Sequence, residues 1–331
     1  MKRRHLLATG AALAVAPWAH AQNAADAGPL RIVVPFPRGG RTTYLAETFA
    51  AALRRVGTEP VAVDYRQGDV TAEIRAFAQG TPDARTLLLA GVRLPRRGTP
   101  VAPPDAENRL MESLVPVTLV ARDPMVLLMN PARADALRIR NTADLLRYLR
   151  AHPGQLTIAT GVDGTIDHMA TELFKSMTRT YLTRLPANGL TPDALGVAGG
   201  RVDLLFAELS AAIDSVRDGA FRVLGIACGA DDPQPTPRTL GMASGPVTLQ
   251  QADRSLARFE AYSYYSLFAP PGTPEGLTAP LQQAGARALA LPDVRRELLQ
   301  HSAIPGGQTQ AEFLRIEDDE AARWRVGQAR W

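Results

Sequence analysis

Apolar residues occur along this chain in short runs and at helical spacing, and the first such pair covers residues 30–49. The run at 30–34 predicts a buried strand, and the apolar spacing after the turn at 35–40 predicts a helix. Either Thr42 or Thr43 is expected to supply the N-cap hydroxyl. The glycines of the turn let the backbone approach a ligand, and the first helical amides carry a partial positive charge. The stretch therefore predicts either a site for a small anion, such as a carboxylate, or a plain βα loop.

The same pattern continues to residue 130. Strands are predicted at 61–63 and 86–90, with a helix at 69–79 between them. This βαβαβ order implies a parallel sheet that binds ligands at the carboxyl ends of its strands. A Pro- and Arg-rich surface loop is expected at 93–105. Two apolar runs within 114–130, separated at 121–124, predict a strand that leads from one domain into another.

A second α/β unit follows, and it repeats the opening design. The predicted order is helix 142–151, strand 156–159, a glycine turn at 160–165, helix 166–177, strand 203–206, helix 210–217 and strand 223–227. The aromatic run at 262–274 predicts a return crossing. Helices at 275–291, 293–300 and 310–324 are expected to pack back on the first domain. Two such units facing each other predict a cleft that closes on a ligand by hinge motion.

Composition agrees with two exported domains. The chain has 331 residues, of which 46% are hydrophobic and 21% charged, as in ordinary globular proteins. Lys2, Arg3 and Arg4, the apolar stretch at 6–18 and a small residue at position 21 predict a signal peptide over residues 1–21, of the Sec or twin-arginine type. Its removal leaves a net charge of about +1 from the formal +4. No later apolar run is long enough to predict a membrane span.

Candidate catalytic chemistry is sparse. No nucleophile elbow, phosphate-loop lysine motif or dinucleotide fingerprint occurs, and the histidines outside the signal peptide share no metal-ligand spacing. His168 faces a ligand or serves as a packing or capping residue, and Glu208, at a strand end, has a solvated or capping role by default. Cys228 is expected to be a buried thiol, and no aromatic–basic stripe predicts nucleic-acid binding. We predict no catalytic residue, no metal, no cofactor and no nucleic-acid partner.

Five motifs in one order resemble the Bug family, the extracytoplasmic solute-binding proteins related to the receptor subunit of tripartite tricarboxylate transporters. The resemblance covers residues 30–324. The motifs are Val33-Val34-Pro35-Phe36-Pro37-x-Gly39-Gly40 with Thr42, Val115-Pro116-Val117-Thr118-Leu119-Val120-Ala121, Gly161-x-x-Gly164-Thr165-x-x-His168, Gly199-Gly200-x-Val202-Asp203-Leu204-x-Phe206 and Leu267-Phe268-Ala269-Pro270-x-Gly272-Thr273-Pro274.

This resemblance implies the type II periplasmic binding protein fold, with two α/β domains joined by two crossing strands around an interdomain cleft. Domain 1 is expected at 29–121 and 265–331, and domain 2 at 122–264. The implied protein is a periplasmic monomer that binds a small carboxylate and has a membrane transporter or a sensor ectodomain as partner. The expected ligand-binding residues are Phe36, Arg38, Gly39, Gly40, Arg41, Thr42, Thr43, Thr160, Gly161, Gly164, Thr165, His168, Asn188 and Glu208.

The chain departs from the family pattern at several of these positions. Arg38, Arg41 and Thr43 occupy variable positions of the first motif, and Ala207 replaces an acidic residue. More arginine and less aspartate favour a more anionic ligand. The alternative is a diverged receptor that no longer binds the family's ligands and acts through contact with a sensor or transporter. A hydrolase is a third hypothesis.

Overall fold

The computed structural model describes residues 28–57, 60–92, 106–161, 163–186, 202–233, 240 and 248–328. The described strands are β1 (Leu30–Val34), β2 (Val61–Tyr65), β3 (Thr86–Val92), β4 (Val115–Met129), β5 (Thr157–Thr160), β6 (Thr183–Pro186), β7 (Leu204–Glu208), β8 (Arg222–Ile226), β9 (Tyr262–Ala269) and β10 (Ile304–Pro305). The described helices are α1 (Arg41–Val56), α2 (Val70–Ala78), α3 (Ala106–Ser113), α4 (Pro131–Ala136), α5 (Thr142–Ala151), α6 (Ile166–Thr178), α7 (Leu209–Arg217), α8 (Leu249–Ala252), α9 (Glu275–Ala290), α10 (Pro292–Gln300) and α11 (Gln310–Gln328).

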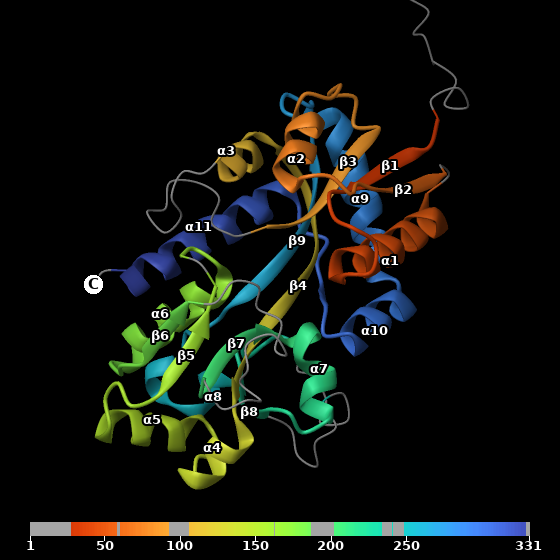
Figure 1. Cartoon of the computed structure of the whole chain (residues 1–331). Helices are drawn as coiled ribbons and strands as arrows, with labels where there is room; N and C mark the ends of the chain where they lie inside the picture. The colour runs from red at the N-terminus through yellow and green to blue at the C-terminus, as the bar shows by residue number, and fades with distance from the viewer. Residues whose placement is uncertain are drawn as a thin grey trace, which may run out of the picture.

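The strands form one hydrogen-bonded path through two units, in the order β2-β1-β3-β9-β4-β7-β5-β6 (Figure 1). In the first unit, β1 pairs in parallel with β2 and β3, which confirms the parallel sheet predicted from the βαβαβ order. In the second unit, β5 pairs in parallel with β6 and β7. The carboxyl ends of β1 and β5 therefore each lead into a helix, α1 and α6.

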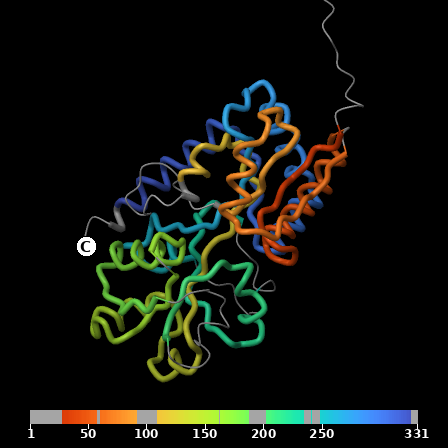
Figure 2. Tube along the Cα trace, turned by 45° about the horizontal axis from the view of Figure 1, so that its top comes forward, coloured from red at the N-terminus to blue at the C-terminus, as the bar shows by residue number. Residues whose placement is uncertain are grey.

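The two crossing strands β4 and β9 connect the units. They pair antiparallel, with Arg122 opposite Tyr264 and Asp123 opposite Ser263. β4 continues without a break to pair with β7 and β8 in the second unit, so residues 121–124 do not interrupt it. Two irregularities shift the β4–β9 register before Arg122. Both crossings predicted from the sequence are therefore strands of one ribbon, as the tube along the chain also shows (Figure 2).

Helices cover both faces of the first sheet. α1 and α9 pack against each other on one face, where Phe49 and Leu45 are buried with Leu87 of β3. α2 and α3 contact each other, and Ile74 and Phe77 of α2 join a second cluster that includes Leu88. The alternation of Leu87 and Leu88 between the two clusters follows from the two-residue period of a strand. Of the described helices, none is both long and apolar enough to cross a membrane.

The C-terminal helix α11 departs from the packing that the sequence predicts. α9 contacts α1, and α10 contacts α9 and β10, but α11 lies along α6 of the second unit (Figure 1). The Trp324 side chain is 2% exposed and joins the second unit's core, beside Leu173 and Phe174 of α6. The expectation that every terminal helix packs on the first unit is therefore wrong for α11. The domain boundaries themselves stay a prediction.

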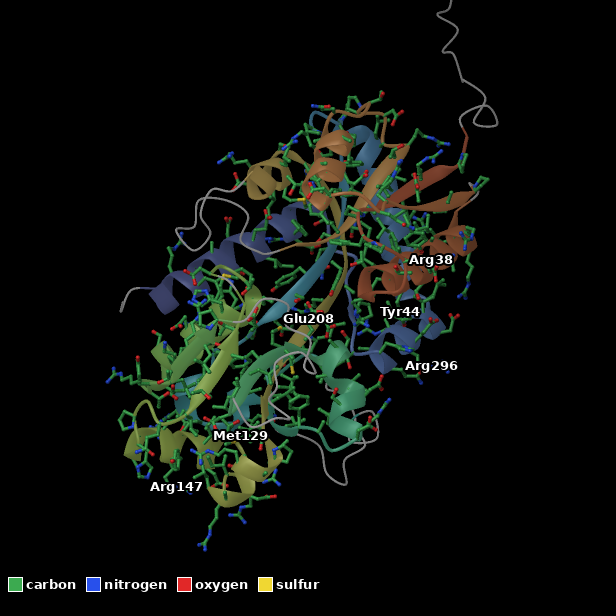
Figure 3. The ribbon with its side chains drawn as sticks, in the orientation of Figure 1. Arg38, Tyr44, Met129, Arg147, Glu208 and Arg296 are labelled. Atoms are coloured by element: carbon green, nitrogen blue, oxygen red, sulfur yellow. The ribbon has the colours of Figure 1, made fainter. Side chains whose placement is uncertain are left out.

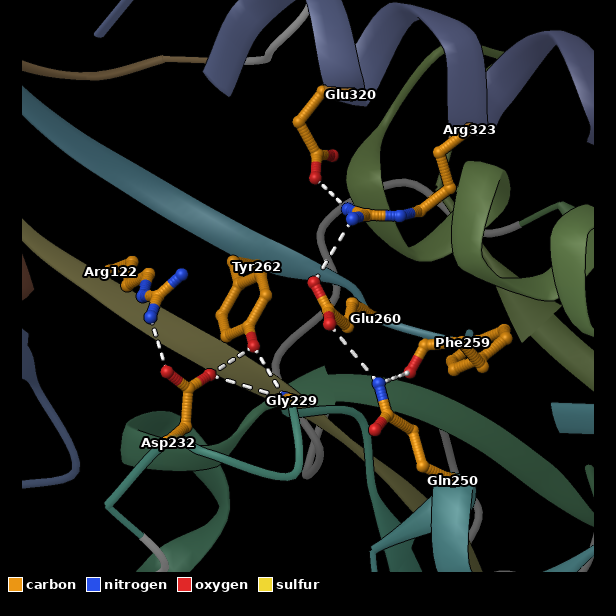
Figure 4. Close-up of polar contacts among 9 residues, drawn as sticks. All are labelled: Arg122, Gly229, Asp232, Gln250, Phe259, Glu260, Tyr262, Glu320 and Arg323. Carbon is orange, nitrogen blue, oxygen red and sulfur yellow. Dashed lines mark hydrogen bonds and ion pairs between the residues drawn. The ribbon is translucent and has the colours of Figure 1, made fainter. Parts of the chain in front are cut away.

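A polar network ties α11 to the crossing strands (Figure 4). Arg323 of α11 donates to Glu260 at 3.0 Å and pairs with Glu320 of the same helix. Glu260, just before β9, also accepts from Gln250 of α8 at 3.1 Å. On β4, Arg122 pairs with Asp232 and lies 4.7 Å from the ring centroid of Tyr262, whose hydroxyl donates to Asp232. Side chains from β4, β9, α8 and α11 thus meet where the units join.

Candidate functional site

The first glycine turn leads directly from β1 into α1. Gly40 is the N-cap residue, and no side chain caps the helix. The prediction that Thr42 or Thr43 is the N-cap is therefore wrong, because both lie within the first helical turn; Thr43 instead accepts from the Gly39 N–H at 3.1 Å. Gly39 has φ +113°, a conformation that favours glycine. A Cβ added at either glycine would meet no described atom within 4 Å, so the space above the turn is open.

The amides that begin α1 are available to an anion. The first backbone bond of the helix runs from the Tyr44 N–H to the Gly40 carbonyl at 3.2 Å. The N–H groups of the three preceding residues, Arg41 to Thr43, have no intrahelical acceptor. They lie at the positive end of a 16-residue helix. This end of α1 therefore has the geometry of a carboxylate site.

Arg38 turns away from this site. Its side chain is 70% exposed, pairs with Glu47 at 2.8 Å and lies 5.2 Å from the ring centroid of Tyr65. Figure 3 shows Arg38 on the α1 side of the first unit, well separated from Glu208. Phe36, by contrast, is half-buried against the core under α1. Arg38 therefore adds no charge at the start of α1 in this structure.

Arg41 turns toward the crossing strands. Its Nη2 lies 3.3 Å from Oδ2 of Asp123, which is fully buried, while the Arg41 side chain is 15% exposed. Nε and Nη2 of Arg41 have no hydrogen-bond partner among the described residues. An arginine that is ion-paired but short of hydrogen-bond acceptors can still bind a carboxylate.

Six residues form what we call the junction cluster, from α1, both crossing strands and the β7–α7 corner: Arg41, Asp123, Glu208, Ser210, Ser263 and Tyr265. The Ser210 hydroxyl donates to Asp123. Glu208 accepts from the hydroxyls of Ser263 at 2.6 Å and Tyr265 at 2.9 Å. Glu208 is thus the N-cap residue of α7 by position, but its side chain bonds the crossing strand β9 and makes no capping hydrogen bond to the helix.

Burial controls the protonation of the junction cluster. Desolvation raises the pKa of Asp123 to about 7; the Arg41 charge opposes this rise and the Glu208 charge adds to it. Burial, with the nearby Glu208 charge, also raises the pKa of Tyr265, so its hydroxyl stays a donor. Near neutral pH the Asp123 carboxyl of the cluster is thus partly protonated.

The second glycine turn is closed by its own side chains. The Gly161 N–H donates to the Asp167 carboxylate, and the Gly164 N–H donates to Nδ1 of His168 at 3.0 Å. The Asp167 carboxylate also accepts backbone N–H groups at the start of α6, including that of His168, which opposes the rise that burial causes in its pKa. The N-terminus of α6 therefore already has a carboxylate, unlike that of α1.

Arg184 of β6 holds the second turn in place. It donates through Nε to the Thr160 hydroxyl at 2.6 Å and through Nη2 to the Gly161 carbonyl at 3.0 Å. Its Nη1 lies 2.6 Å from Asp163, and this contact lowers the pKa of that carboxyl. The Thr160 side chain is buried and hydrogen-bonded, and Thr165 is the N-cap residue of α6.

His168 is neutral in this environment. Burial, with the charge of Arg184, lowers its pKa to about 4. Because Nδ1 accepts from Gly164, the ring proton lies on Nε2, which is 3.9 Å from Asp163 and 4.0 Å from Oε1 of Glu172. Oε1 of Glu172 has no hydrogen-bond partner in the described chain, while Oε2 lies 2.7 Å from Lys175.

The sequence identified the two turns but missed the side chains that set their charge. Asp123, Ser210, Ser263, Tyr265 and Arg184 carry no recognisable motif, although a charged Arg122–Asp123 pair inside an apolar strand was a usable signal. Asn188 and the 93–105 loop lie outside the described residues. Within the described ranges no cluster of three His, Cys, Asp or Glu side chains suits a metal ion. A cavity of about 270 Å³ lies elsewhere, between β1, α2 and Pro270.

Two α/β units joined by two crossing strands, each with a helix that begins at a glycine turn, define the class of two-domain periplasmic binding proteins. The chain belongs to the tripartite tricarboxylate transporter family of receptors, TctC, whose family model matches residues 45–327. Members of this family are extracytoplasmic solute-binding proteins. The membership expected from the five sequence motifs is thereby confirmed.

Named relatives cover nearly the whole chain. Protein BugT of Bordetella pertussis is 28% identical over 299 residues, which are 90% of this chain and 87% of BugT. A Pseudomonas protein from the tcbD–tcbE intergenic region is 29% identical over 98% of this chain and 93% of its own length. The structure of R. palustris Rpa4515 with adipate has a TM-score of 0.69 at 28% identity, and covers 91% of this chain and 96% of Rpa4515. The periplasmic binding protein BugD, at 20% identity and a TM-score of 0.64, covers 89% of this chain and 95% of its own and shows the same fold.

Proposed function

We propose that this protein is an exported receptor that binds a small organic carboxylate between its two units and does not catalyse a reaction. The observation that carries the proposal is the open N-terminus of α1: an added Cβ at Gly39 or Gly40 would meet no described atom, and Nε and Nη2 of Arg41 have no hydrogen-bond acceptor among the described residues. The adipate bound by the 28% identical Rpa4515 supports a carboxylate as ligand.

In this proposal the ligand carboxylate accepts from the first amides of α1 and from Arg41. The junction cluster lies next to it and the second turn lies across from it, so that closure of the two units encloses the ligand. The signal peptide over 1–21 delivers the mature chain to the periplasm, where a membrane transporter is the partner that the family membership supports.

Calorimetry and thermal unfolding of the mature chain, residues 22–331, with mono-, di- and tricarboxylates test the proposal. A ligand at a hundred times its Kd stabilises the folded state by about 2.7 kcal/mol, so a clear rise in Tm is expected. Gly40→Val places a side chain in the open space at an extended backbone position and should abolish the rise.

Gly276→Val is the matched control, because Gly276 also lies at the start of a helix, α9, with no atom within 4 Å of an added Cβ. Equal loss of binding in both variants, or no binding of any carboxylate by the native chain, would contradict the proposal. If the protein is instead a diverged receptor, the native chain should bind no carboxylate and should capture a transporter or sensor domain.

A further inference from the structure

The charges around the two turns are already paired. The described cations there are Arg41, Arg184 and Lys175, and each lies within ion-pair distance of a carboxylate, at 3.3, 2.6 and 2.7 Å. Arg38 is paired outside the site with Glu47. The carboxylates outnumber these cations, because Asp167 and Glu208 add to Asp123, Asp163 and Glu172. The site therefore offers no surplus positive charge to a polyanion.

The two helix N-termini are not equivalent. Asp167 already accepts from the Gly161 N–H and from amides at the start of α6. Among the described residues no side chain caps the corresponding amides of α1, and the Thr43 hydroxyl accepts from Gly39 instead. One ligand carboxylate fits at α1, but a second would lie next to the negative charge of Asp167.

Glu208 lies near the middle of the molecule, between the units (Figure 3). Its two partners, Ser263 and Tyr265, are neutral hydroxyls, and no cationic side chain of the described chain pairs with it. A carboxylate has about four acceptor sites, so two donors leave capacity for more. Glu172 adds a second acceptor without a donor, because Oε1 of this side chain, 7% exposed, has no partner in the described chain.

A half-buried carboxylate whose donors are neutral hydroxyls is stabilised further by a positively charged donor. We propose that the ligand is a net-neutral aminocarboxylic acid, whose carboxylate binds at the start of α1 with Arg41 and whose ammonium group binds Glu208. This inference rests on the proposed function and narrows its ligand class. It also reverses the expectation, drawn from Arg38 and Arg41 in the sequence, of a more anionic ligand.

The test compares acids of equal length that differ in one terminal group. Calorimetry on the mature chain at pH 7.5 measures the Kd of each acid, in three matched pairs. The pairs are succinate and 4-aminobutanoate, glutarate and 5-aminopentanoate, and adipate and 6-aminohexanoate. The native protein should bind at least one amino acid ten-fold or more tightly than its matching diacid. Glu208→Gln removes the charge and keeps an acceptor oxygen for one of the two hydroxyls, which donate to different carboxylate oxygens of Glu208. It should erase or invert that preference.

Glu47→Gln is the matched control, since Glu47 also accepts from a tyrosine hydroxyl, Tyr65 at 2.9 Å, but lies on the outer surface. It should leave the preference unchanged. If Glu208→Gln does not fold, Glu208→Asp replaces it, because this variant withdraws the charge by one methylene. It should weaken the binding of the amino acid more than the binding of the diacid.

The outcomes separate the two proposals. Diacid binding that is tighter in the native chain and unaffected by Glu208→Gln overturns the aminocarboxylate inference and leaves the carboxylate receptor standing. Absence of binding by every acid overturns the proposed function, and this inference with it.

Discussion

Arg323 of α11 donates to Glu260 across 3.0 Å and so links the last helix of the chain to the segment that enters β9. The same guanidinium pairs with Glu320, whose carboxyl is buried. Burial raises the pKa of Glu320 to about 7, against the opposing charge of Arg323. One arginine therefore compensates two carboxylates at the place where α11 meets the crossing strand.

Arg323→Met should destabilise the protein by about 3 kcal/mol, because it removes the arginine that is ion-paired with the buried Glu320 carboxylate while keeping the apolar stem. Urea unfolding at pH 8, where Glu320 is mostly ionised, measures the loss. Arg325→Met is the control, since Arg325 lies exposed on the same helix. Equal losses in the two variants would show that the pair does not matter.

Arg41→Met should also destabilise, by about 2–4 kcal/mol at pH 8, because Asp123 is fully buried beside it. The loss should shrink at pH 5, where Asp123 takes up a proton. Arg38→Met, which breaks an exposed pair, should leave the unfolding midpoint unchanged. Similar midpoints for all three proteins at pH 8 would contradict the structural difference between the two arginines.

Asp123 should make the native protein less stable as the pH rises from about 4 to 7. Its folded pKa is about 7 and its ordinary value is 3.8, so in this window the folded state binds the extra proton. Asp123→Asn cannot ionise, and its stability relative to the native chain should therefore increase across the same window. Urea unfolding at pH 4.5 and 7.5 checks the sign, and a constant difference would refute the raised pKa.

His168 should have the opposite effect. Its folded pKa is about 4 against an ordinary 6.5, so the unfolded chain binds more protons and native stability falls as the pH drops from 6.5 toward 4. In His168→Asn the side-chain oxygen can still accept from Gly164, and this loss should disappear. NMR titration of the imidazole gives a direct reading, and a midpoint near 6.5 would rule out the buried, neutral ring.

Gly306 should tolerate no side chain. An added Cβ would lie 2.1 Å from the Leu119 carbonyl oxygen on β4, so Gly306→Ala should cost about 3 kcal/mol or more. Gly276→Ala is the comparison, because that site is open and helical, and it should stabilise by about 0.5 kcal/mol. Thermal unfolding of both variants distinguishes them, and similar midpoints would contradict the close approach of β10 to β4.

Local patterns predicted most of the elements. The bounds of α5 agree with the sequence expectation because Leu145, Leu146 and Leu149 mark one buried face after an Asn141 N-cap. β6 was missed, since Arg184 and the exposed Leu185 break the apolar alternation of so short a strand. The position of α11 was also not predictable, because helical periodicity shows that a face is buried but not against which partner.

At the candidate site, too, the sequence predicted local structure but not which residues contact each other. Glycines at 39, 40, 161 and 164 located both turns, since positive φ and close approach leave a trace in the sequence. The sequence does not show the directions of Arg38 and Arg41, because Arg41 pairs with a residue in a distant strand while Arg38, in the turn, pairs with Glu47 of the helix that follows it. Arg38 and Arg41 in the first motif therefore suggested a more anionic ligand, and only the pairing shows that their charges are already compensated.

The two register shifts in β4 have a consequence for insertions and deletions. Arg122 and Asp123 are neighbours that point to opposite faces of the ribbon, Arg122 toward Asp232 and Asp123 toward Arg41. Loss of one residue upstream would move Asp123 into the place of Arg122, opposite Asp232, and Pro124 into the place of Asp123, beside Arg41. One attractive contact would become repulsive, and the other would be lost. The number of residues in β4 before Arg122 therefore determines which side chain lies opposite Asp232 and which lies beside Arg41.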